Sequence, residues 1–372
     1  MRILLIRSYP SYVNISNRTY NVQELGLAKA LVRSGVTCDI VFWSSTKNMN
    51  KTYKFDGNMS IDIFYRVAIV MYKAIFYTHI DELIGKYDVV QSAEYDSPES
   101  MYIAVRYPRK AVIYHGPYFH PFNKRYNLYC KMIDPLFISL YRWKKTRFIT
   151  KSGLAKDFLL QKGINSSNVT TIGVGVDEDD FMVDDRLEEI SLVFDYLYIG
   201  RIEPRRNILF LLELIAELLK HESENGIVII GDGDADYKEK CINKIHELGI
   251  ESNVIWIKQV KQEHLAKYYK RAKFFLLPTI YEIFGMVILE AMYFGCVVVS
   301  SINGGSQMLI NDNVTGVIIS DFDVLSWKDR IINITSEQMD MLSINASNHI
   351  KSHFIWEKLA PLFKKCYKNV LH

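Results

Sequence analysis

The sequence predicts an α/β protein of two domains, each built on a parallel sheet with crossover helices. Short apolar runs of strand length alternate with segments of helical period along the whole chain, which is typical of parallel strands joined by helices. At 372 residues the chain can form two domains with separate hydrophobic cores. No apolar run approaches the roughly 18 residues that a membrane-spanning helix needs.

In the first half, apolar runs predict buried strands and one segment predicts an amphipathic helix. The helix spans about 22–34, where apolar residues recur on one face, and Gly35 is expected to end it. The predicted strands are Arg2–Ile6, Thr37–Trp43, Tyr87–Val90, Ala111–His115 and Arg147–Thr150.

The second half repeats this scheme more regularly, with helical stretches between the strands. The predicted strands are Asp195–Ile199, Gly226–Ile230, Val254–Ile257, Phe274–Leu277, Val297–Ser300 and Val317–Ile319.

The two halves carry opposite net charge. Residues 1–176 hold 24 Lys and Arg against 12 Asp and Glu, whereas residues 177–372 hold 21 against 30. The sign changes at the acidic stretch Val176–Asp180, which continues to Glu188 and Glu189, and we place the domain boundary there. Without a nucleic-acid-binding motif, the basic half favours an anionic substrate or an anionic membrane face.

The five cysteines are widely scattered and form no C-x-x-C pair. This pattern argues for reduced thiols in the cytoplasm and against a structural zinc site.

The run from Pro278 to Gly305 is the most informative about function. Glu282 follows a predicted strand, and Glu290 lies about one turn inside the helix that begins near Gly285. Backbone N–H groups at a helix start can face phosphates, and a carboxylate one turn on can accept from a ribose diol. The spacing alone is equally compatible with an ordinary strand–loop–helix that carries two surface glutamates.

Three motifs in order resemble the signature of retaining glycosyltransferases of family 4 (glycosyl transferases group 1). They are Gly200-Arg201-Ile202-Glu203-Pro204-Arg205-Arg206-Asn207, Gly231-Asp232-Gly233, and the run with Glu282, Phe284-Gly285, Glu290-Ala291-Met292 and Gly304-Gly305. The resemblance implies the GT-B architecture, in which two Rossmann-like domains with parallel sheets face a central cleft. Residues 1–176 would form the acceptor-side domain, joined by a C-terminal helix over 354–372, and residues 177–353 would bind the nucleotide sugar.

The resemblance implies a role for each motif residue. Arg201 and Arg206 would bind the donor pyrophosphate, Glu282 would contact the donor sugar near the reacting carbon, and Glu290 would bind the ribose. His115, which ends a predicted strand, matches a histidine near the donor sugar. We predict that the catalytic residues are Glu282, His115, Arg201 and Arg206, and that Gly231, Gly233, Phe284, Gly285, Met286, Lys258 and Val260 complete the donor site.

Residue type alone leaves two of these roles open. Arg206, which replaces the lysine usual in the family, could instead pair with the local acid Glu203. A lone histidine after a strand, such as His115, could be structural.

The acceptor side departs from the family, because the glycine-rich loop after the first strand is missing. Ser8-Tyr9-Pro10-Ser11-Tyr12 and Asn14–Asn17 replace it, and we expect Ser8, Tyr9 and Asn14 to meet acceptor hydroxyls. Met308 also stands where the family usually has a glutamate.

The triplet Asp232-Gly233-Asp234 imitates a D-x-D metal motif but lies in a turn after a predicted strand. We therefore predict no metal site and no cofactor, with a nucleotide-diphosphate sugar as the donor substrate.

The stretch 126–148 mixes aromatic and cationic residues and predicts either an interfacial segment on an anionic membrane or a half-buried helix with a basic end.

The sequence thus predicts a cytoplasmic retaining glycosyltransferase, which the interfacial interpretation of 126–148 would place on the inner face of the cytoplasmic membrane. It would transfer a sugar from a nucleotide-diphosphate donor, UDP in preference to GDP, to a glycan or polyprenyl-linked acceptor of capsule or lipopolysaccharide. The alternatives are a GT-B sugar-nucleotide epimerase and a non-catalytic sugar-nucleotide-binding partner of another transferase. No nucleic-acid partner is expected.

Overall fold

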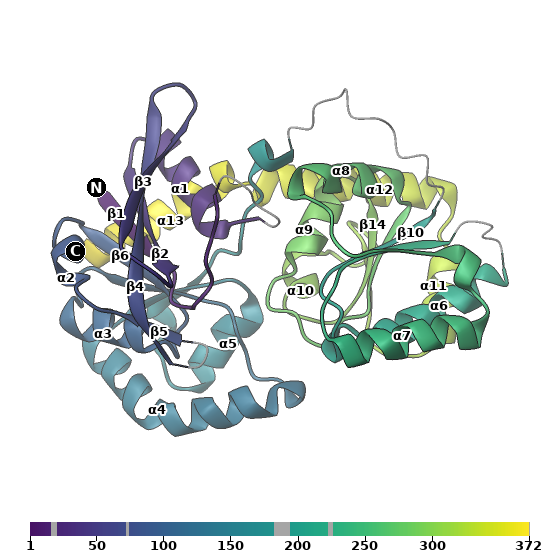
Figure 1. Cartoon of the computed structure of the whole chain (residues 1–372), viewed down its shortest axis with the longest axis horizontal. Helices are drawn as coiled ribbons and strands as arrows, with labels where there is room; N and C mark the ends of the chain where they lie inside the picture. Colours follow the sequence, from purple (N-terminus) through teal and green to yellow (C-terminus); the bar gives the residue numbers. More distant parts are fainter. Residues whose placement is uncertain (16–20, 72–73, 182–193, 222–225, 372) are drawn as a thin grey trace. The chain divides into compact units, whose positions relative to one another are not determined.

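The computed structural model describes residues 1–15, 21–71, 74–181, 194–221 and 226–371. The chain divides into an N-terminal unit, residues 1–18, 22–175 and 355–372, and a C-terminal unit, residues 19–21 and 176–354 (Figure 1). The boundaries expected after residues 176 and 353 lie within one residue of these limits. The end of the acidic stretch, Glu188 and Glu189, lies outside the described residues, as do positions 16 and 17 of the acceptor loop.

The N-terminal unit is built on a sheet that has nine strands in the described part of the chain. The strands follow the order β3-β4-β2-β1-β6-β7-β8-β9, and β5 pairs with β4. Their bounds are β1 Arg2–Ile6, β2 Thr37–Ser44, β3 Met49–Phe55, β4 Met59–Met71, β5 Ala74–Tyr77, β6 Val89–Ala93, β7 Ala111–His115, β8 Arg147–Thr150 and β9 Val169–Thr171.

This sheet differs from the expected parallel one at one side. Strands β3, β4 and β5 lie where the sequence analysis predicts none, and β4 runs antiparallel to both β3 and β5. Strand β3 is mostly exposed, so it has no apolar run to mark it. Asp56 and Gly57 between β3 and β4 both adopt positive φ, the turn chemistry of a hairpin, and this dipeptide is the local signal for it.

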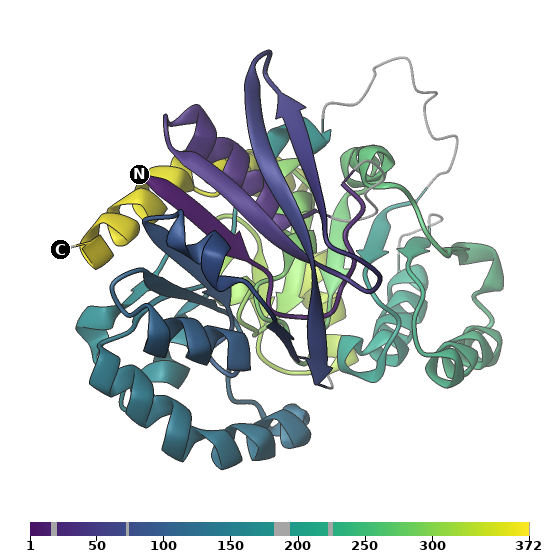
Figure 2. The ribbon, with the colours of Figure 1, turned by 60° about the vertical axis from the view of Figure 1, so that its left-hand side comes forward.

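Helices cover the N-terminal sheet, and one of them comes from the far end of the chain. They are α1 Gln23–Arg33, α2 Asp81–Gly85, α3 Pro98–Arg106, α4 Lys124–Lys144, α5 Gly153–Gln161 and α13 Trp356–Leu371. Helix α13 lies beside α1 (Figures 1 and 2). The hydroxyl of Tyr367 donates to Oε1 of Gln91 in β6, 2.8 Å away. The expected return of the C-terminal segment to the first domain is therefore observed.

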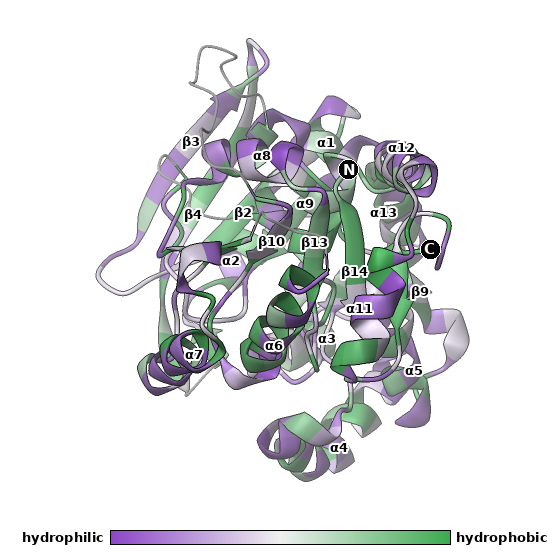
Figure 3. Cartoon of the chain, turned by 90° about the vertical axis from the view of Figure 1, so that its right-hand side faces the viewer, coloured by the Kyte–Doolittle hydropathy of each residue, from purple (hydrophilic) through white to green (hydrophobic). Residues whose placement is uncertain are grey.

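The C-terminal unit is built on a wholly parallel sheet of six described strands. Their order is β12-β11-β10-β13-β14-β15. Their bounds are β10 Tyr196–Ile199, β11 Ile227–Ile230, β12 Val254–Ile257, β13 Phe274–Leu277, β14 Val297–Ser301 and β15 Val317–Ile319. Because these strands are almost entirely apolar, each predicted strand of this half is found within one residue, and β13 and β14 are largely green in Figure 3.

Most helices of the C-terminal unit connect these parallel strands, and the last two follow the final strand. They are α6 Ile208–Leu219, α7 Ala235–Leu248, α8 Gln262–Arg271, α9 Met286–Tyr293, α10 Ser306–Leu309, α11 Val324–Ile332 and α12 Ser336–His353. Among the described residues of the chain, no helix is long and apolar enough to cross a membrane.

Candidate active site

The strand order of the C-terminal sheet defines where a ligand would bind. From β10 the chain proceeds outward through β11 and β12, and then returns to β13 on the other side of β10 before continuing to β14 and β15. Such a reversal opens a crevice beyond the carboxyl ends of the two central strands. The loop with Arg201 and Arg206 follows β10, and the loop with Glu282 follows β13, so both lie at this point.

An ion-pair cluster joins these two loops. Arg206 donates a hydrogen bond from Nη1 to Oε2 of Glu282, and the two side chains are 11% and 13% exposed. Arg205 donates from Nη1 to the carbonyl of Tyr281 over 2.8 Å and from Nε to Glu203 over 2.7 Å. Two arginines from one loop therefore hold the backbone and the carboxylate of the other.

The cluster keeps both members of the central pair charged. Burial alone would raise the pKa of Glu282, but the charges of Arg206 and Arg205 and the hydrogen bond from Arg206 lower it. Burial would lower the pKa of Arg206, but the charge of Glu282 raises it. The local alternative partner, Glu203, lies 3.9 Å from Nε of Arg206, so Glu282 is the closer partner.

The start of helix α9 supplies backbone N–H groups beside this cluster. Gly285 precedes the helix with φ +78°, a conformation that side chains disfavour, and no side chain caps the helix. The first N–H groups of a helix have no carbonyl partner within it, so those near Met286 can receive an anion. The Phe284 side chain is buried, so a ligand could contact only the backbone of this residue.

Glu290 lies inside α9 and is 3% exposed. Its carboxylate accepts hydrogen bonds from Nε2 of Gln262, at 3.1 Å, and from the hydroxyl of Tyr269, at 3.0 Å. Burial raises its pKa to about 7, against the lowering effect of these two bonds. A carboxylate has four acceptor sites, so the two bonds leave room for a ribose diol.

The G-x-G turn after β11 is shaped by contact with the loop after β10. A Cβ on Gly231 would lie 1.9 Å from the carbonyl oxygen of Gly200, and one on Gly233 would lie 2.3 Å from that of Ile202. Packing between the two loops therefore requires glycine at both positions, whether or not a ligand binds. The two glycines hold the Arg201 loop against the next strand.

The two aspartates of this turn have protein partners. Asp232 accepts from Nζ of Lys238 at 3.2 Å and pairs with Nζ of Lys258 at 3.3 Å. Asp234 caps α7 by accepting from the N–H of Tyr237. Within the described ranges, no group of three or more His, Cys, Asp or Glu side chains could hold a metal ion.

The remaining predicted donor residues lie at the same edge of the sheet. Arg201 is exposed and has no side-chain ion pair or hydrogen bond among the described residues. Its guanidinium can therefore donate hydrogen bonds to a phosphate. Lys258 is 76% exposed, and Val260 is half-buried in the loop between β12 and α8.

His115 ends β7 in the N-terminal unit and is wholly buried. Its Nδ1 lies 3.0 Å from Oε2 of Glu94, which also accepts from the N–H of Gly116, and Oε1 of Glu94 accepts from Nζ of Lys151 over 3.0 Å. The other ring nitrogen has no partner among the described residues. His115 thus holds Glu94 here, and its contact with a donor sugar stays a prediction.

Glu94 is the centre of this second cluster. It has φ +64°, an uncommon conformation for a residue with a side chain. Burial would raise its pKa, but the charge of Lys151 and the hydrogen bond from His115 lower it to about 2. An ionised carboxylate therefore joins the ends of β6, β7 and β8.

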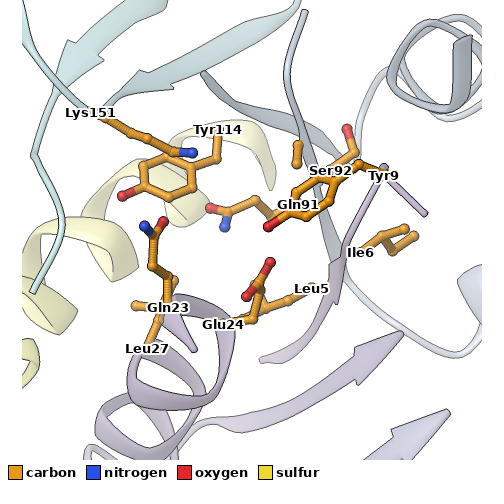
Figure 4. Close-up of a pocket in the computed structure, with 11 residues that line it drawn as sticks. Leu5, Ile6, Tyr9, Gln23, Glu24, Leu27, Gln91, Ser92, Tyr114 and Lys151 are labelled. Carbon is orange, nitrogen blue, oxygen red and sulfur yellow. The ribbon is translucent and has the colours of Figure 1, made fainter. Parts of the chain in front are cut away.

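Another buried ion pair lies where the expected glycine-rich loop is missing. Nε of Arg7 donates to Oε1 of Glu24 over 2.9 Å, and Glu24 lies in the first turn of α1. Figure 4 shows Glu24 and Gln23 pointing from α1 toward Gln91 and Tyr114 around a small cavity. Its volume of about 20 Å³ suits a water molecule but not a sugar.

The predicted acceptor residues separate in the structure. Ser8 and Tyr9 line a larger cavity of the N-terminal unit, with a volume of about 640 Å³. The Ser8 hydroxyl also accepts from the N–H of Ala93 over 3.2 Å. Asn14 is exposed and does not belong to the residues that line this cavity.

With this geometry established, comparison with known families concerns mainly the C-terminal unit. Residues 191–351 match the family model described as "Glycosyl transferases group 1". The C-terminal unit is thus the part of the chain that matches this family, and it is called the group 1 domain below. An uncharacterized glycosyltransferase of Methanocaldococcus jannaschii is 28% identical over 199 residues, which are 52% of this chain and 46% of that protein. The lipopolysaccharide 1,2-N-acetylglucosaminetransferase of Salmonella typhimurium is 29% identical over 186 residues, 46% of this chain and 48% of that protein.

Solved structures are similar to the whole chain. The sucrose-phosphate synthase from Thermosynechococcus elongatus covers 100% of this chain and 99% of its own at a TM-score of 0.73 and 17% identity. The structure of Anabaena HepE in complex with UDP covers 99% of this chain and 100% of its own, at a TM-score of 0.74 and 15% identity. The fold class is therefore GT-B, with two Rossmann-like domains. The matches to the two sequence relatives, by contrast, span less than half of each relative.

The sequence did not single out several residues that the structure places in contact with His115 or Glu290. Glu94 directly follows β6, but the predicted strand ended at Val90, so the rule that functional residues follow strand ends missed it. Lys151 directly follows a strand that was predicted correctly, and the same rule would have found it. Gln262 and Tyr269 lie seven positions apart on one face of α8, a spacing too common to single out.

Proposed function

We propose that this protein is a retaining glycosyltransferase of family 4. It would transfer a sugar from a nucleotide-diphosphate donor to a hydroxyl of a glycan or lipid-linked glycan. The observation that carries the proposal is the Arg206–Glu282 cluster at the switch point of the group 1 domain, beside the N-terminus of α9. Cations, free N–H groups and a carboxylate then converge where a sugar diphosphate needs them.

The proposed chemistry assigns a separate task to each side chain. Arg201 and Arg206 neutralise the charge that develops on the leaving diphosphate. Glu282, kept ionised by its arginines, stabilises positive charge at the reacting carbon of the sugar. The leaving phosphate takes the proton of the acceptor hydroxyl, so acceptor and departing diphosphate share one face of the sugar and its configuration is retained.

We propose a uridine diphosphate sugar as the donor and surface polysaccharide as the product. Support for the donor comes from HepE, which has been crystallised with UDP-glucose, and support for the product comes from the similar lipopolysaccharide glycosyltransferase. The test is a thermal-shift panel of UDP, GDP, ADP and their sugar conjugates, with Glu290→Ala as control. Because a ligand that binds the native state raises its apparent stability, UDP compounds should raise Tm in the wild type but not in the variant.

Turnover with an acceptor decides between the proposal and its rivals. Release of UDP that requires an added glycan acceptor supports a transferase. A donor that binds but is never consumed would favour a non-catalytic sugar-nucleotide-binding partner, and sugar isomerisation without an acceptor would favour an epimerase.

We further propose that catalysis needs no divalent metal. Asp232 and Asp234, which imitate a metal motif, are engaged by two lysines and by a helix N-terminus. Activity is expected to persist in excess chelator, and complete loss that added magnesium restores would overturn this part of the proposal.

We also propose that the stretch 126–148 contacts a membrane. The contact would be made by its exposed apolar side chains and not by all of its aromatic ones. Phe137 and Tyr141 are buried, whereas Leu128, Met132, Leu136 and Trp143 are 56–74% exposed and recur at helical spacing on α4. Lys124, Lys131 and Arg142 are exposed along one flank of this apolar face. An exposed apolar face beside cations suits the surface of an anionic membrane on the cytoplasmic side.

Liposome co-sedimentation tests this face of α4. The wild type should sediment with vesicles that contain phosphatidylglycerol, and the variant Met132→Ser/Trp143→Ser should not. Met341→Ser/Ile344→Ser is the matched control, because these residues of α12 are similarly exposed in the other unit. Equal sedimentation of all three proteins would refute the membrane role, as would no effect of neutralising Arg142, Lys144 and Lys145 together.

A further inference from the structure

The larger cavity of the N-terminal unit has the form of a ligand site that the group 1 match does not reach. Its volume of about 640 Å³ lies within the range of small-molecule sites. It lies at the end of β1 and β6, beside the first turns of α4. Its lining includes Glu94, Asp96, Ser97, Lys124, Arg125 and Tyr126.

Ser97 provides a buried polar group with bonding capacity to spare. It is 4% exposed, and its hydroxyl has no hydrogen-bond partner among the described residues. An unpartnered buried hydroxyl is costly unless something else satisfies it, and a ligand hydroxyl in the cavity would do so.

Asp96, next to Ser97, supplies acceptor oxygens. Oδ1 of Asp96 accepts from the Tyr126 hydroxyl over 3.4 Å, and the carboxylate also accepts from the backbone N–H of Asp96 itself, so it has two donors. The second carboxylate of the lining, Glu94, already has three donors. Asp96 is therefore the carboxylate with acceptor capacity left for a sugar hydroxyl.

Aromatic rings form much of the remaining wall. Tyr9, Phe122 and Tyr129 are 38–43% exposed, and Tyr126 is half-buried. Tyr129 donates from its hydroxyl to the carbonyl of Asp96 over 3.0 Å, which fixes its ring beside the carboxylate. Rings held next to hydroxyl-binding groups suit the alternating apolar and polar faces of a sugar.

Two cations lie at the α4 side of the cavity. Lys124 and Arg125 are both exposed, and neither has a side-chain partner among the residues that the structure describes. The lining is thus divided between carboxylates from the end of β6 and cations from the start of α4. A guanidinium and an ammonium without acids to pair with favour a phosphate group.

We propose that this cavity binds a phosphate-bearing carbohydrate, with its sugar at Asp96, Ser97 and Tyr126 and its phosphate at Lys124 and Arg125. The inference rests on the proposed function, because this carbohydrate would be the acceptor. The small cavity at Glu24 has too little volume for a sugar, whereas the larger one has both the volume and the polar lining that an acceptor sugar needs. The phosphate can belong to a soluble sugar phosphate or to a lipid-linked sugar diphosphate on the membrane that α4 meets.

Saturation-transfer NMR with the full chain and saturating UDP tests the site, with glucose 1-phosphate and glucose as probes. Glucose 1-phosphate should bind at least about tenfold more tightly than glucose, because two charge-assisted bonds are added. Lys124→Ala/Arg125→Ala should abolish this difference without changing the affinity for glucose. Ser97→Ala should weaken both probes.

Lys54→Ala/Lys86→Ala is the matched control, because it removes two exposed cations of the same unit outside the cavity lining and should leave both affinities unchanged. A prenyl diphosphate-linked glucose identifies the source of the phosphate. Binding tighter than glucose 1-phosphate indicates a lipid-linked acceptor, and equal binding indicates a soluble one; either supports a phosphate-bearing sugar.

The inference is overturned if glucose 1-phosphate and glucose bind alike, or if the Lys124/Arg125 variant binds the phosphate probe like the wild type. A UDP thermal shift on the same samples separates this failure from that of the proposed function. If UDP stabilises the protein while both probes fail to bind, only the acceptor inference falls. If UDP also has no effect, the proposed function falls with it.

Discussion

Arg206 and Glu282 come from loops after two neighbouring strands of one sheet, and their side chains form a largely buried ion pair. The sequence analysis gives each residue a different task, one on the phosphate and one on the sugar. In the structure their side chains also bind each other. The arginine that is expected to bind a phosphate is thus also the group that keeps the glutamate ionised and in place.

This pairing predicts coupled effects of substitution. Glu282→Gln and Arg206→Ala should each lower kcat/KM by about 100-fold or more, since each removes charge from the reacting region. Each should also lower the free energy of unfolding by about 3 kcal/mol, because the remaining partner is left without its counter-charge. Arg206→Ala/Glu282→Gln should lose less stability than the sum of the two, as measured by urea unfolding. Strict additivity would show that the pair is not coupled.

The pKa of about 7 at Glu290 predicts a pH dependence of donor binding. A ribose diol donates to the ionised carboxylate, so the affinity for UDP should rise as the pH increases from about 6 to 8. Calorimetric titration of the wild type and of Glu290→Gln measures this. The variant should lose the part of the pH dependence that is due to Glu290. The pH dependence that remains in the variant includes the protonation of the UDP phosphate, so the variant also controls for it. Identical profiles would contradict the prediction.

The same carboxyl has a predictable effect on stability. Its pKa is raised in the folded protein, so the native state binds more protons than the unfolded state between about pH 4.5 and 7. Stability should therefore fall with rising pH across this window, by an amount that Glu290→Gln removes. Thermal unfolding at several pH values measures the slope.

Two substitutions separate the possible roles of His115. Asn can reproduce the Nδ1 contact to Glu94, whereas Gln reproduces the position of Nε2. If His115 acts by holding Glu94, His115→Asn should stay within about 1 kcal/mol of the wild type, and His115→Gln should be less stable and less active. Higher activity in His115→Gln than in His115→Asn would instead favour a direct contact of Nε2 with the donor sugar. Urea unfolding and steady-state kinetics on both variants provide the comparison.

Gly231 should tolerate no side chain, because its Cβ would lie 1.9 Å from a backbone oxygen. Gly231→Ala is expected to cost about 2–3 kcal/mol of stability or to prevent folding, as the two loops must separate. Gly153→Ala is the matched control, since nothing lies within 4 Å of a Cβ there and the residue begins a helix. The control should remain within about 1 kcal/mol of the wild type or gain stability. Equal unfolding midpoints for the two variants would contradict the prediction.

The sequence by itself determined the group 1 domain in most respects. Its strands are continuous apolar runs, because a parallel sheet is buried on both faces, and its motif residues follow strand ends. The order of motifs was enough to place Arg201, Arg206, Glu282 and Glu290 at one edge of one sheet. Local pattern and chain order carry this information, so no distant contact is needed to read it.

The tertiary structure alone decided which of these residues meet. Whether Arg206 pairs with Glu203 or with Glu282, 76 positions away, depends on the adjacency of β10 and β13, and an alternation of apolar runs does not encode strand order. Ser8 and Glu94 likewise line one cavity because the parallel pairing of β1 and β6 brings the ends of these two strands together. Side-chain pairing across a sheet is a long-range property, which the order of residues along one chain leaves open.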